Sequence, residues 1–166
     1  PWSTACPPPC ARLAGVTRSD IVPRCAGAVA ANIGALPFAA GAFEVAVFDP
    51  PYLYGRSSAK LHDRPNGDWE SWHTRMELPE QFIHLCRMAS RELARVLVPA
   101  GLLVAKAADS RYQGKLVLNH VRLIEVFEPR FALRDVLVYV RLATGMFVNT
   151  RSAQNTHGYY VIMERR

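Results

Sequence analysis

The chain has 166 residues, of which half are hydrophobic and a fifth are charged. This composition excludes a disordered chain, and the length fits one domain, residues 1–166, that can bury a sizeable core. The net charge of +6 permits a polyanionic partner such as nucleic acid, and it is equally compatible with an ordinary, mildly basic domain.

The four cysteines do not predict a metal site, and no segment predicts export. Cys6 and Cys10 are separated by three prolines, which is not a zinc-ligand spacing, and no second pair follows. Residues 26–48 lack lysine and arginine over a length that could span a bilayer, but their glycines, proline and polar residues favour short strands. Without a secretory signal pattern, we expect a cytoplasmic protein that does not enter a membrane.

The first half of the chain reads as short strands followed by a long loop. Residues 1–15 carry four prolines and no periodicity. Residues 16–21 could form a short strand ending near Asp20, and the more apolar residues 28–33 and 42–48 predict two further short strands. Residues 53–76 then lack any period and are rich in Gly, Ser, Asn and charges, which is long for a connection unless it is functional or disordered.

The second half alternates helices and strands. A helix is predicted from Pro79, because apolar residues then recur at three- and four-residue steps, from Phe82 to Leu97. The sequence Pro99-Ala100-Gly101 is expected to end this helix. The elements predicted after it are a strand at 102–107, a helix at 115–128, a strand at 133–141, a loop at 142–156 and a strand at 158–164.

The strand at 42–48 ends abruptly at Asp49-Pro50-Pro51-Tyr52. Two consecutive prolines cannot continue a strand, because neither has a backbone N–H to donate to the ladder. A carboxylate and an aromatic ring are therefore held by a stiff backbone at the carboxyl end of a buried strand. In open α/β sheets this is the end at which ligands bind.

These four residues resemble the DPPY motif of S-adenosylmethionine-dependent amino-methyltransferases, which methylate exocyclic amino groups of adenine or cytosine. Residues 35–52, 94–109 and 155–166 are similar to three passages of that family, most closely the small phage- and bacterial-type DNA methylases. The resemblance implies an α/β, Rossmann-like class I methyltransferase sheet, mostly parallel with an antiparallel last strand. It also implies S-adenosylmethionine as cofactor and nucleic acid, DNA rather than RNA, as partner.

One part of the family pattern has no counterpart in this sequence. The glycine-rich loop after the first strand, which wraps the cofactor, is represented only by Gly15. Either that strand and loop precede residue 1, or the cofactor site is degenerate. We expect the domain to be truncated at its N-terminus, because the other predicted strands are intact.

The resemblance assigns catalytic roles to the tetrad. Asp49 and the Pro50 carbonyl would accept hydrogen bonds from the target amine, Pro51 would stiffen their spacing, and Tyr52 would stack on a flipped base. Because an ordinary carboxylate has a pKa near ~4, positioning and electrostatics explain the role of Asp49 better than proton abstraction does. The alternatives are a strand-end turn acid and a half-buried aromatic.

Further residues are assigned to cofactor and substrate. Asp20 resembles the acid that binds ribose hydroxyls, and Asn32, with Ile33 beside it and Asp49, would complete the cofactor site; turn or cap roles remain open. The candidate substrate contacts are Tyr52, Arg56, Lys60, Trp69 and Lys106. For these the alternatives are a solvated loop and a lysine whose stem lies along the sheet.

Polar residues near the other strand ends have no assigned role. Asp109 and Asn119 are of this kind, and His120 and His157 are interpreted as structural histidines.

The leading hypothesis is a DNA amino-methyltransferase; an RNA base methyltransferase and a non-catalytic, methyltransferase-like protein are the alternatives. The oligomeric state is not predicted.

Overall fold

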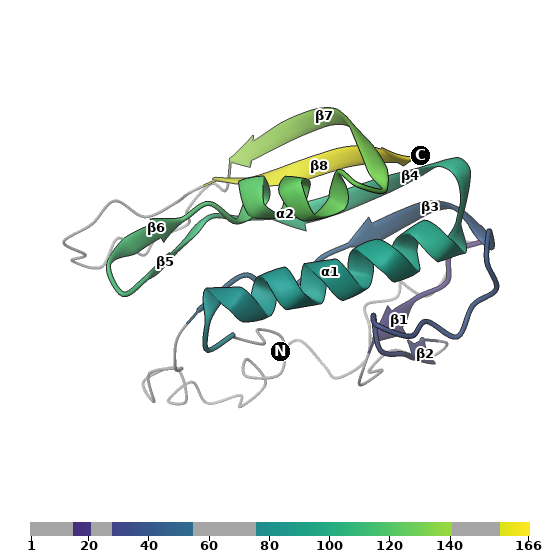
Figure 1. The fold of residues 1–166 in the computed structure, drawn as a ribbon, viewed down its shortest axis with the longest axis horizontal. Coiled ribbons are helices and arrows are strands. Elements are labelled where there is room, and N and C mark those ends of the chain that lie inside the picture. The colour runs from purple at the N-terminus through teal and green to yellow at the C-terminus, as the bar shows by residue number, and fades with distance from the viewer. Residues whose placement is uncertain (1–14, 21–27, 55–75, 141–156) are drawn as a thin grey trace, which may run out of the picture.

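The structure, a computed structural model, describes residues 15–20, 28–54, 76–140 and 157–166. Two helices and eight strands lie in these ranges (Figure 1). Neither helix is long and apolar enough to cross a membrane. In chain order the elements are β1 (Ser19–Asp20), β2 (Val29–Ala30), β3 (Phe43–Phe48), α1 (Pro79–Val96), β4 (Leu97–Ala107), β5 (Ser110–Tyr112), β6 (Lys115–Val117), α2 (Asn119–Phe127), β7 (Phe131–Val140) and β8 (His157–Arg165).

The main sheet has four strands in the order β3-β4-β8-β7. β3 pairs with β4 in parallel, whereas β8 is antiparallel to both of its neighbours, as predicted for the last strand. Three strands thus run in one direction, but only one adjacent pair is parallel, so the expected mostly parallel sheet is realised as a mixed one. β1 and β2 form a separate parallel pair.

Helix α1 begins at Pro79, as predicted, and β4 follows it without a separate loop. The Gln81 side chain accepts hydrogen bonds from the backbone N–H groups of Glu77 and Leu78, which caps the first turn. Residues 98–101 lie within β4, where they form a bulge against β3. Gly101 is required there, since a Cβ atom would lie 2.8 Å from the Val98 carbonyl oxygen.

The prediction of one helix over residues 115–128 is wrong at its start. β5 and β6 form an antiparallel hairpin whose two-residue turn is Gln113-Gly114. Both turn residues have positive φ, at 49° and 78°, which suits the twist of a tight hairpin. Helix α2 therefore begins only at Asn119, and this start places its first residues at the end of β4.

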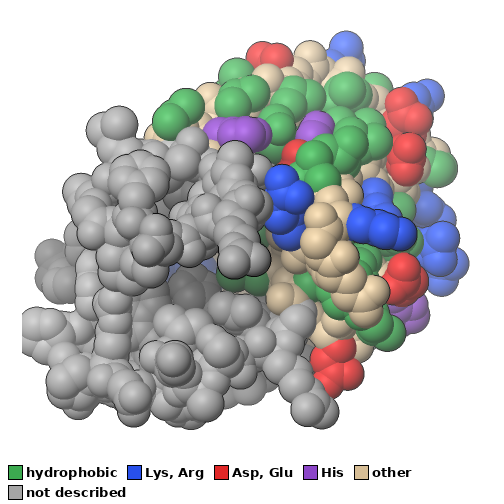
Figure 2. Space-filling model, turned by 90° about the vertical axis from the view of Figure 1, so that its left-hand side faces the viewer, with side chains coloured by type: hydrophobic (Ala, Val, Ile, Leu, Met, Phe, Trp, Pro, Cys, Tyr) green, Lys and Arg blue, Asp and Glu red, His purple; other side chains and the backbone are tan. Residues whose placement is uncertain are grey.

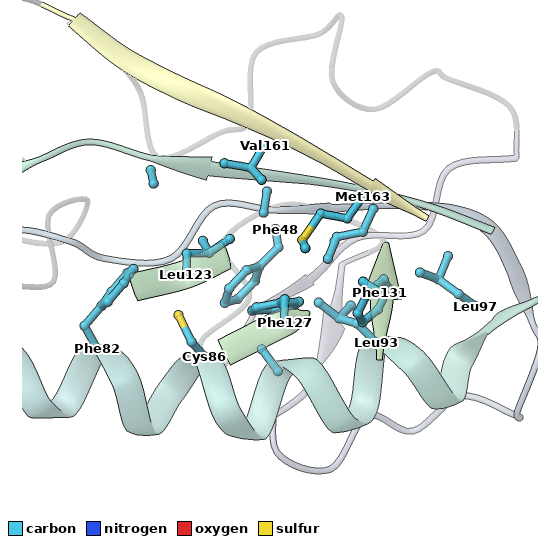
Figure 3. Close-up of a cluster of buried hydrophobic side chains, with 14 of the residues drawn as sticks. Phe48, Phe82, Cys86, Leu93, Leu97, Leu123, Phe127, Phe131, Val161 and Met163 are labelled. Atoms are coloured by element: carbon cyan, nitrogen blue, oxygen red, sulfur yellow. The ribbon is translucent and has the colours of Figure 1, made fainter. Parts of the chain in front are cut away.

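The hydrophobic core lies between the helices and one face of the sheet (Figure 3). Each of these elements contributes fully buried side chains, namely Phe82, Cys86, Ala89, Leu103, Ala105, Leu123, Phe127, Val161 and Met163. The rings of Phe48 and Phe127 lie 6.0 Å apart, which ties the end of β3 to α2. No helix in the described ranges covers the opposite face, where Val45 and Val47 are exposed.

A polar cluster fixes the segment before β3 onto α1. The Arg95 guanidinium donates to the carbonyl oxygens of Leu36 and Phe38, at 2.8 and 2.6 Å. Glu92 pairs with Arg95 at 2.7 Å and accepts the Leu36 N–H at 2.8 Å. The hydrogen bond from Arg95 is the main cause that holds the pKa of Glu92 below its ordinary value.

Candidate active site

The tetrad Asp49-Pro50-Pro51-Tyr52 leaves the sheet at the carboxyl end of β3. The ladder with β4 stops at the pair Phe48–Ala105, one residue before Asp49. Pro50 is buried, whereas the Asp49 side chain is 53% exposed. Tyr52 is partly buried and packs against the core. The structure thus places an exposed acid at the carboxyl end of β3, followed by a partly buried aromatic ring.

Lys106 lies next to Asp49 and forms an ion pair with it. The Lys106 ammonium donates to Asp49 Oδ2 at 2.9 Å, across a separation of 57 residues. Partial burial lowers the pKa of Lys106, but the hydrogen bond and charge of Asp49, together with Tyr52 and Tyr139, outweigh it and raise the pKa overall. Lys106 therefore stays charged at neutral pH and fixes one carboxylate oxygen of Asp49, Oδ2.

Asn119, which is fully buried at the start of α2, joins the tetrad loop to the end of β4. Its Nδ2 group donates to the Tyr52 carbonyl oxygen at 3.2 Å, the Ala108 carbonyl oxygen at 2.9 Å and Ser110 Oγ at 3.2 Å. Its Oδ1 accepts the Tyr54 hydroxyl at 2.5 Å. This side chain therefore determines where the backbone after Pro51 lies relative to the sheet.

The described residues that precede and follow residues 55–75 contact each other. Tyr54 and Met76 form an isolated parallel bridge, and the Met76 N–H donates to the Leu53 carbonyl oxygen at 2.9 Å. Burial raises the pKa of Tyr54 to about 12, so its hydroxyl remains a donor at neutral pH. The predicted substrate contacts Arg56, Lys60 and Trp69 lie between these ends, outside the described residues.

A second polar cluster occupies the same sheet edge on the helix side. Asp109, which follows β4 and is buried, contacts His120 Nδ1 at 2.7 Å. The His120 ring stacks on Tyr159 with centroids 3.9 Å apart, and His157 Nε2 lies 3.0 Å from the Tyr159 hydroxyl. Burial, followed by the nearby Asp109 charge, raises the pKa of Tyr159. A carboxylate, two imidazoles and a phenol hydroxyl thus contact one another at this end of the sheet.

No three described His, Cys, Asp or Glu side chains are arranged to hold a metal ion.

Figure 2 views the end of the sheet at which β3 and β4 end. On its described part, basic, acidic and histidine side chains lie close together among hydrophobic ones. Charged and histidine side chains therefore lie at the end of the sheet where β3 and β4 end.

The predicted cofactor residues form a separate group. Asp20 is the last residue of β1, and its carbonyl oxygen accepts the Ala31 N–H at 2.9 Å. Asn32 follows the parallel strand β2, and its Oδ1 accepts the Gly34 N–H at 2.9 Å. Ile33 packs against the core. The structure thus brings Asp20 and Asn32 to the ends of one strand pair, whereas Asp49 follows β3 of the main sheet.

The sequence pattern assigned no role to Asn119 and Asp109 and indicated a structural role for His120. Their contacts depend on the hairpin of β5 and β6, which returns the chain to the end of β4 before α2 starts. The only sequence signal was the turn-forming Gln113-Gly114 pair, which the helical pattern after it obscured.

No protein-family model matches this sequence, and neither does any curated protein. Solved structures do match. One is TTHA0409, a "Putative DNA Modification Methylase" from Thermus thermophilus, complexed with S-adenosyl-L-methionine: 16% identity, TM-score 0.52, covering 78% of this chain and 50% of that one. Another is the N-methyltransferase NodS from Bradyrhizobium japonicum, in complex with S-adenosyl-L-homocysteine: 13% identity, TM-score 0.50, covering 90% and 65%.

These likenesses show the fold. The chain shares the Rossmann-like architecture of S-adenosylmethionine-dependent methyltransferases over the matched residues, in agreement with the fold class expected from the sequence. It spans about half the length of the Thermus protein and less than two thirds of NodS.

Proposed function

We propose that the protein transfers a methyl group from S-adenosylmethionine to the exocyclic amino group of adenine or cytosine in DNA. The observation that carries this proposal is the position of Asp49-Pro50-Pro51-Tyr52 at the open carboxyl end of β3. It is supported by a fold shared with proteins crystallised with S-adenosylmethionine or its demethylated product.

The first requirement of this chemistry is a rigid pair of acceptors for the amine. An aromatic amine is a poor nucleophile because its lone pair is delocalised into the ring, and acceptors on its hydrogens favour the pyramidal nitrogen that attacks. Asp49 Oδ1 and the Pro50 carbonyl oxygen would be those acceptors. Lys106 fixes the other oxygen of Asp49, so the carboxylate does not need to reorient when substrate binds.

The ion pair between Lys106 and Asp49 is better explained by positioning than by stability. Both side chains are partly exposed, at 26% and 53%, and pairs of this kind contribute about 0–1 kcal/mol to folding. A lysine engaged with the acid is also less available to a phosphate. We therefore propose that Lys106 acts through Asp49, in place of the direct substrate contact expected from the sequence.

The second requirement is a surface for the base outside its helix. Tyr52 would stack on the flipped base, and such stacking is worth roughly 1–3 kcal/mol, on the scale of the pairing energy lost. Asn119 holds the Tyr52 carbonyl oxygen, so the backbone that carries this ring is fixed at the sheet edge.

The described residues also fit the cofactor, which would supply an electrophilic methyl group. A carboxylate such as Asp20 at a strand end suits ribose hydroxyls. Asn32 Oδ1 accepts one N–H, from Gly34, and a carbonyl oxygen has a second lone pair for an adenine amino group. Ile33 would add apolar contact beside it.

Two measurements on the intact protein test the proposal. Calorimetric titration should detect S-adenosylmethionine binding, and tritiated-methyl transfer to duplex DNA should exceed transfer to structured RNA. Asp49→Asn keeps the shape of the side chain and should abolish transfer, while Asp20, Asn32 and Ile33 should retain cofactor binding. Normal transfer by Asp49→Asn would show that the tetrad is misassigned.

The same measurements separate the two alternatives. Preferential transfer to RNA would identify a base methyltransferase acting on the other polymer. Failure to bind S-adenosylmethionine at all would indicate a non-catalytic, methyltransferase-like protein.

A further inference from the structure

A groove of about 430 Å³ runs between the exposed faces of α1 and α2, away from the tetrad. α1 lines one side of it, and α2 with the turn that follows lines the other. The lining residues are Ile83, Arg87, Arg91, Glu125, Val126, Pro129 and Arg130. Three guanidinium groups and one carboxylate thus share a small, partly apolar depression.

The three groove arginines, Arg87, Arg91 and Arg130, lack ion-pair partners within the described part of the chain. Two other arginines are paired with carboxylates: Arg95 contacts Glu92 at 2.7 Å, and Arg134 contacts Glu164 at 2.6 Å. Like charges four residues apart on a helix repel each other, and a third charge across the groove adds to this. The groove therefore holds three positive charges against the single carboxylate of Glu125, and none of the three arginines forms an ion pair with a described residue.

We propose that this groove binds the phosphate backbone of nucleic acid. The planar fork of arginine matches phosphate oxygens in a bidentate way, and Arg87 and Arg91 stand one helical turn, about 6 Å, apart along α1. Such a row suits a polymer that carries one charge on every unit. The choice of nucleic acid over an acidic peptide rests on the proposed function.

The position of α2 connects the groove to the candidate active site. The first residue of this helix, Asn119, holds the Tyr52 carbonyl oxygen, and its last turns line the groove. A strand engaged at the sheet edge and one engaged in the groove thus contact the two ends of the same short helix. The groove would add affinity without reading sequence, since phosphate contacts position a nucleic acid and base contacts specify it.

The test measures the salt dependence of DNA binding by fluorescence anisotropy with a labelled duplex. The variants are Arg87→Gln/Arg91→Gln/Arg130→Gln and the single Arg91→Gln; the matched control is Arg134→Gln, which removes the same charge outside the groove. In a plot of log affinity against log salt, the slope should fall in magnitude by about 3 for the triple variant and by about 1 for Arg91→Gln. It should be unchanged for Arg134→Gln.

Several outcomes would overturn the proposal. The triple variant could keep the wild-type slope, or Arg134→Gln could weaken binding as much as Arg91→Gln does. Displacement of the duplex by polyglutamate, as effective as by unlabelled DNA of equal charge, would identify an acidic protein segment as the ligand. Competition by inorganic phosphate with an unchanged DNA slope would reduce the groove to a site for free phosphate. If the triple variant does not fold, Arg91→Gln decides alone.

This test is independent of the proposed chemistry. Loss of slope in a protein that transfers no methyl group would support the groove and contradict the proposed function. Methyl transfer by the wild type, together with an unaltered slope in the triple variant, would support the proposed function and contradict the groove.

Discussion

Asn119 is the residue whose replacement tests most directly how the tetrad loop is held. Asn119→Leu keeps the branched shape and the number of side-chain heavy atoms and removes both polar atoms. The side chain is fully buried, so water cannot replace the lost partners. Three hydrogens are affected: the two on Nδ2, which are shared among the Tyr52 and Ala108 carbonyl oxygens and Ser110 Oγ, and the Tyr54 hydroxyl hydrogen.

The magnitude follows from these contacts. A buried group left without a partner costs about 1–3 kcal/mol, and a typical hydrogen bond contributes about 1 kcal/mol net. Three such losses, offset in part by the added apolar surface of leucine, give about 3–5 kcal/mol in the free energy of unfolding. That is a large share of the stability of a small domain.

A second variant separates the hydrogen bond from the change in packing. In Asn119→Leu/Tyr54→Phe both partners of the 2.5 Å bond are absent, so no tyrosine hydroxyl is left buried and unpaired. We expect this double variant to be more stable than the sum of the single variants by about 1–2 kcal/mol.

The assay is urea denaturation followed by circular dichroism, with methyl transfer measured in parallel below the unfolding transition. Asn119→Leu should also lower kcat more than it raises KM, because the loop that carries Asp49 and Tyr52 is no longer fixed to β4. A destabilisation below about 1 kcal/mol, or strictly additive single variants, would refute the role assigned to Asn119.

Three further predictions concern packing, pH and reactivity. Gly158→Ala places a Cβ atom 2.5 Å from the Tyr139 ring and should destabilise the fold by about 1–3 kcal/mol in urea; an unchanged midpoint would contradict that crowding. Because the folded-state pKa of Glu92 is lowered, its stabilisation is present above the ordinary pKa of ~4.3 and is lost as the pH falls through the folded value. The urea midpoint of Glu92→Gln should therefore depend less on acid pH than that of the wild type, and equal dependence would exclude this role. Burial raises the pKa of Cys86 to about 12, so iodoacetamide should label it only after unfolding, as read by peptide mass spectrometry, and labelling of the native protein would be inconsistent with this burial.

Local patterns in the sequence determined several elements and the position of the tetrad. The apolar spacing from Phe82 onward defines one face of a helix, and the structure confirms α1 from Pro79. Pro50 and Pro51 cannot join a ladder, so β3 had to end before them, and it ends at Phe48. Each of these outcomes depends on neighbouring residues alone, which is why the sequence sufficed.

Tertiary structure decided what surrounds the tetrad. The contacts of Asp49 with Lys106 and of Asn119 with Tyr52 and Tyr54 join residues 57 to 67 positions apart. Such pairs depend on strand register, on the bulge in β4 and on the hairpin that follows it. A register shift of one residue would move every side chain of a strand to the opposite face of the sheet. The sequence by itself therefore determined that an acid and an aromatic ring stand at a strand end. Only the folded sheet decided that a lysine fixes the acid and a buried asparagine holds the loop, because those partners meet through packing and not through spacing.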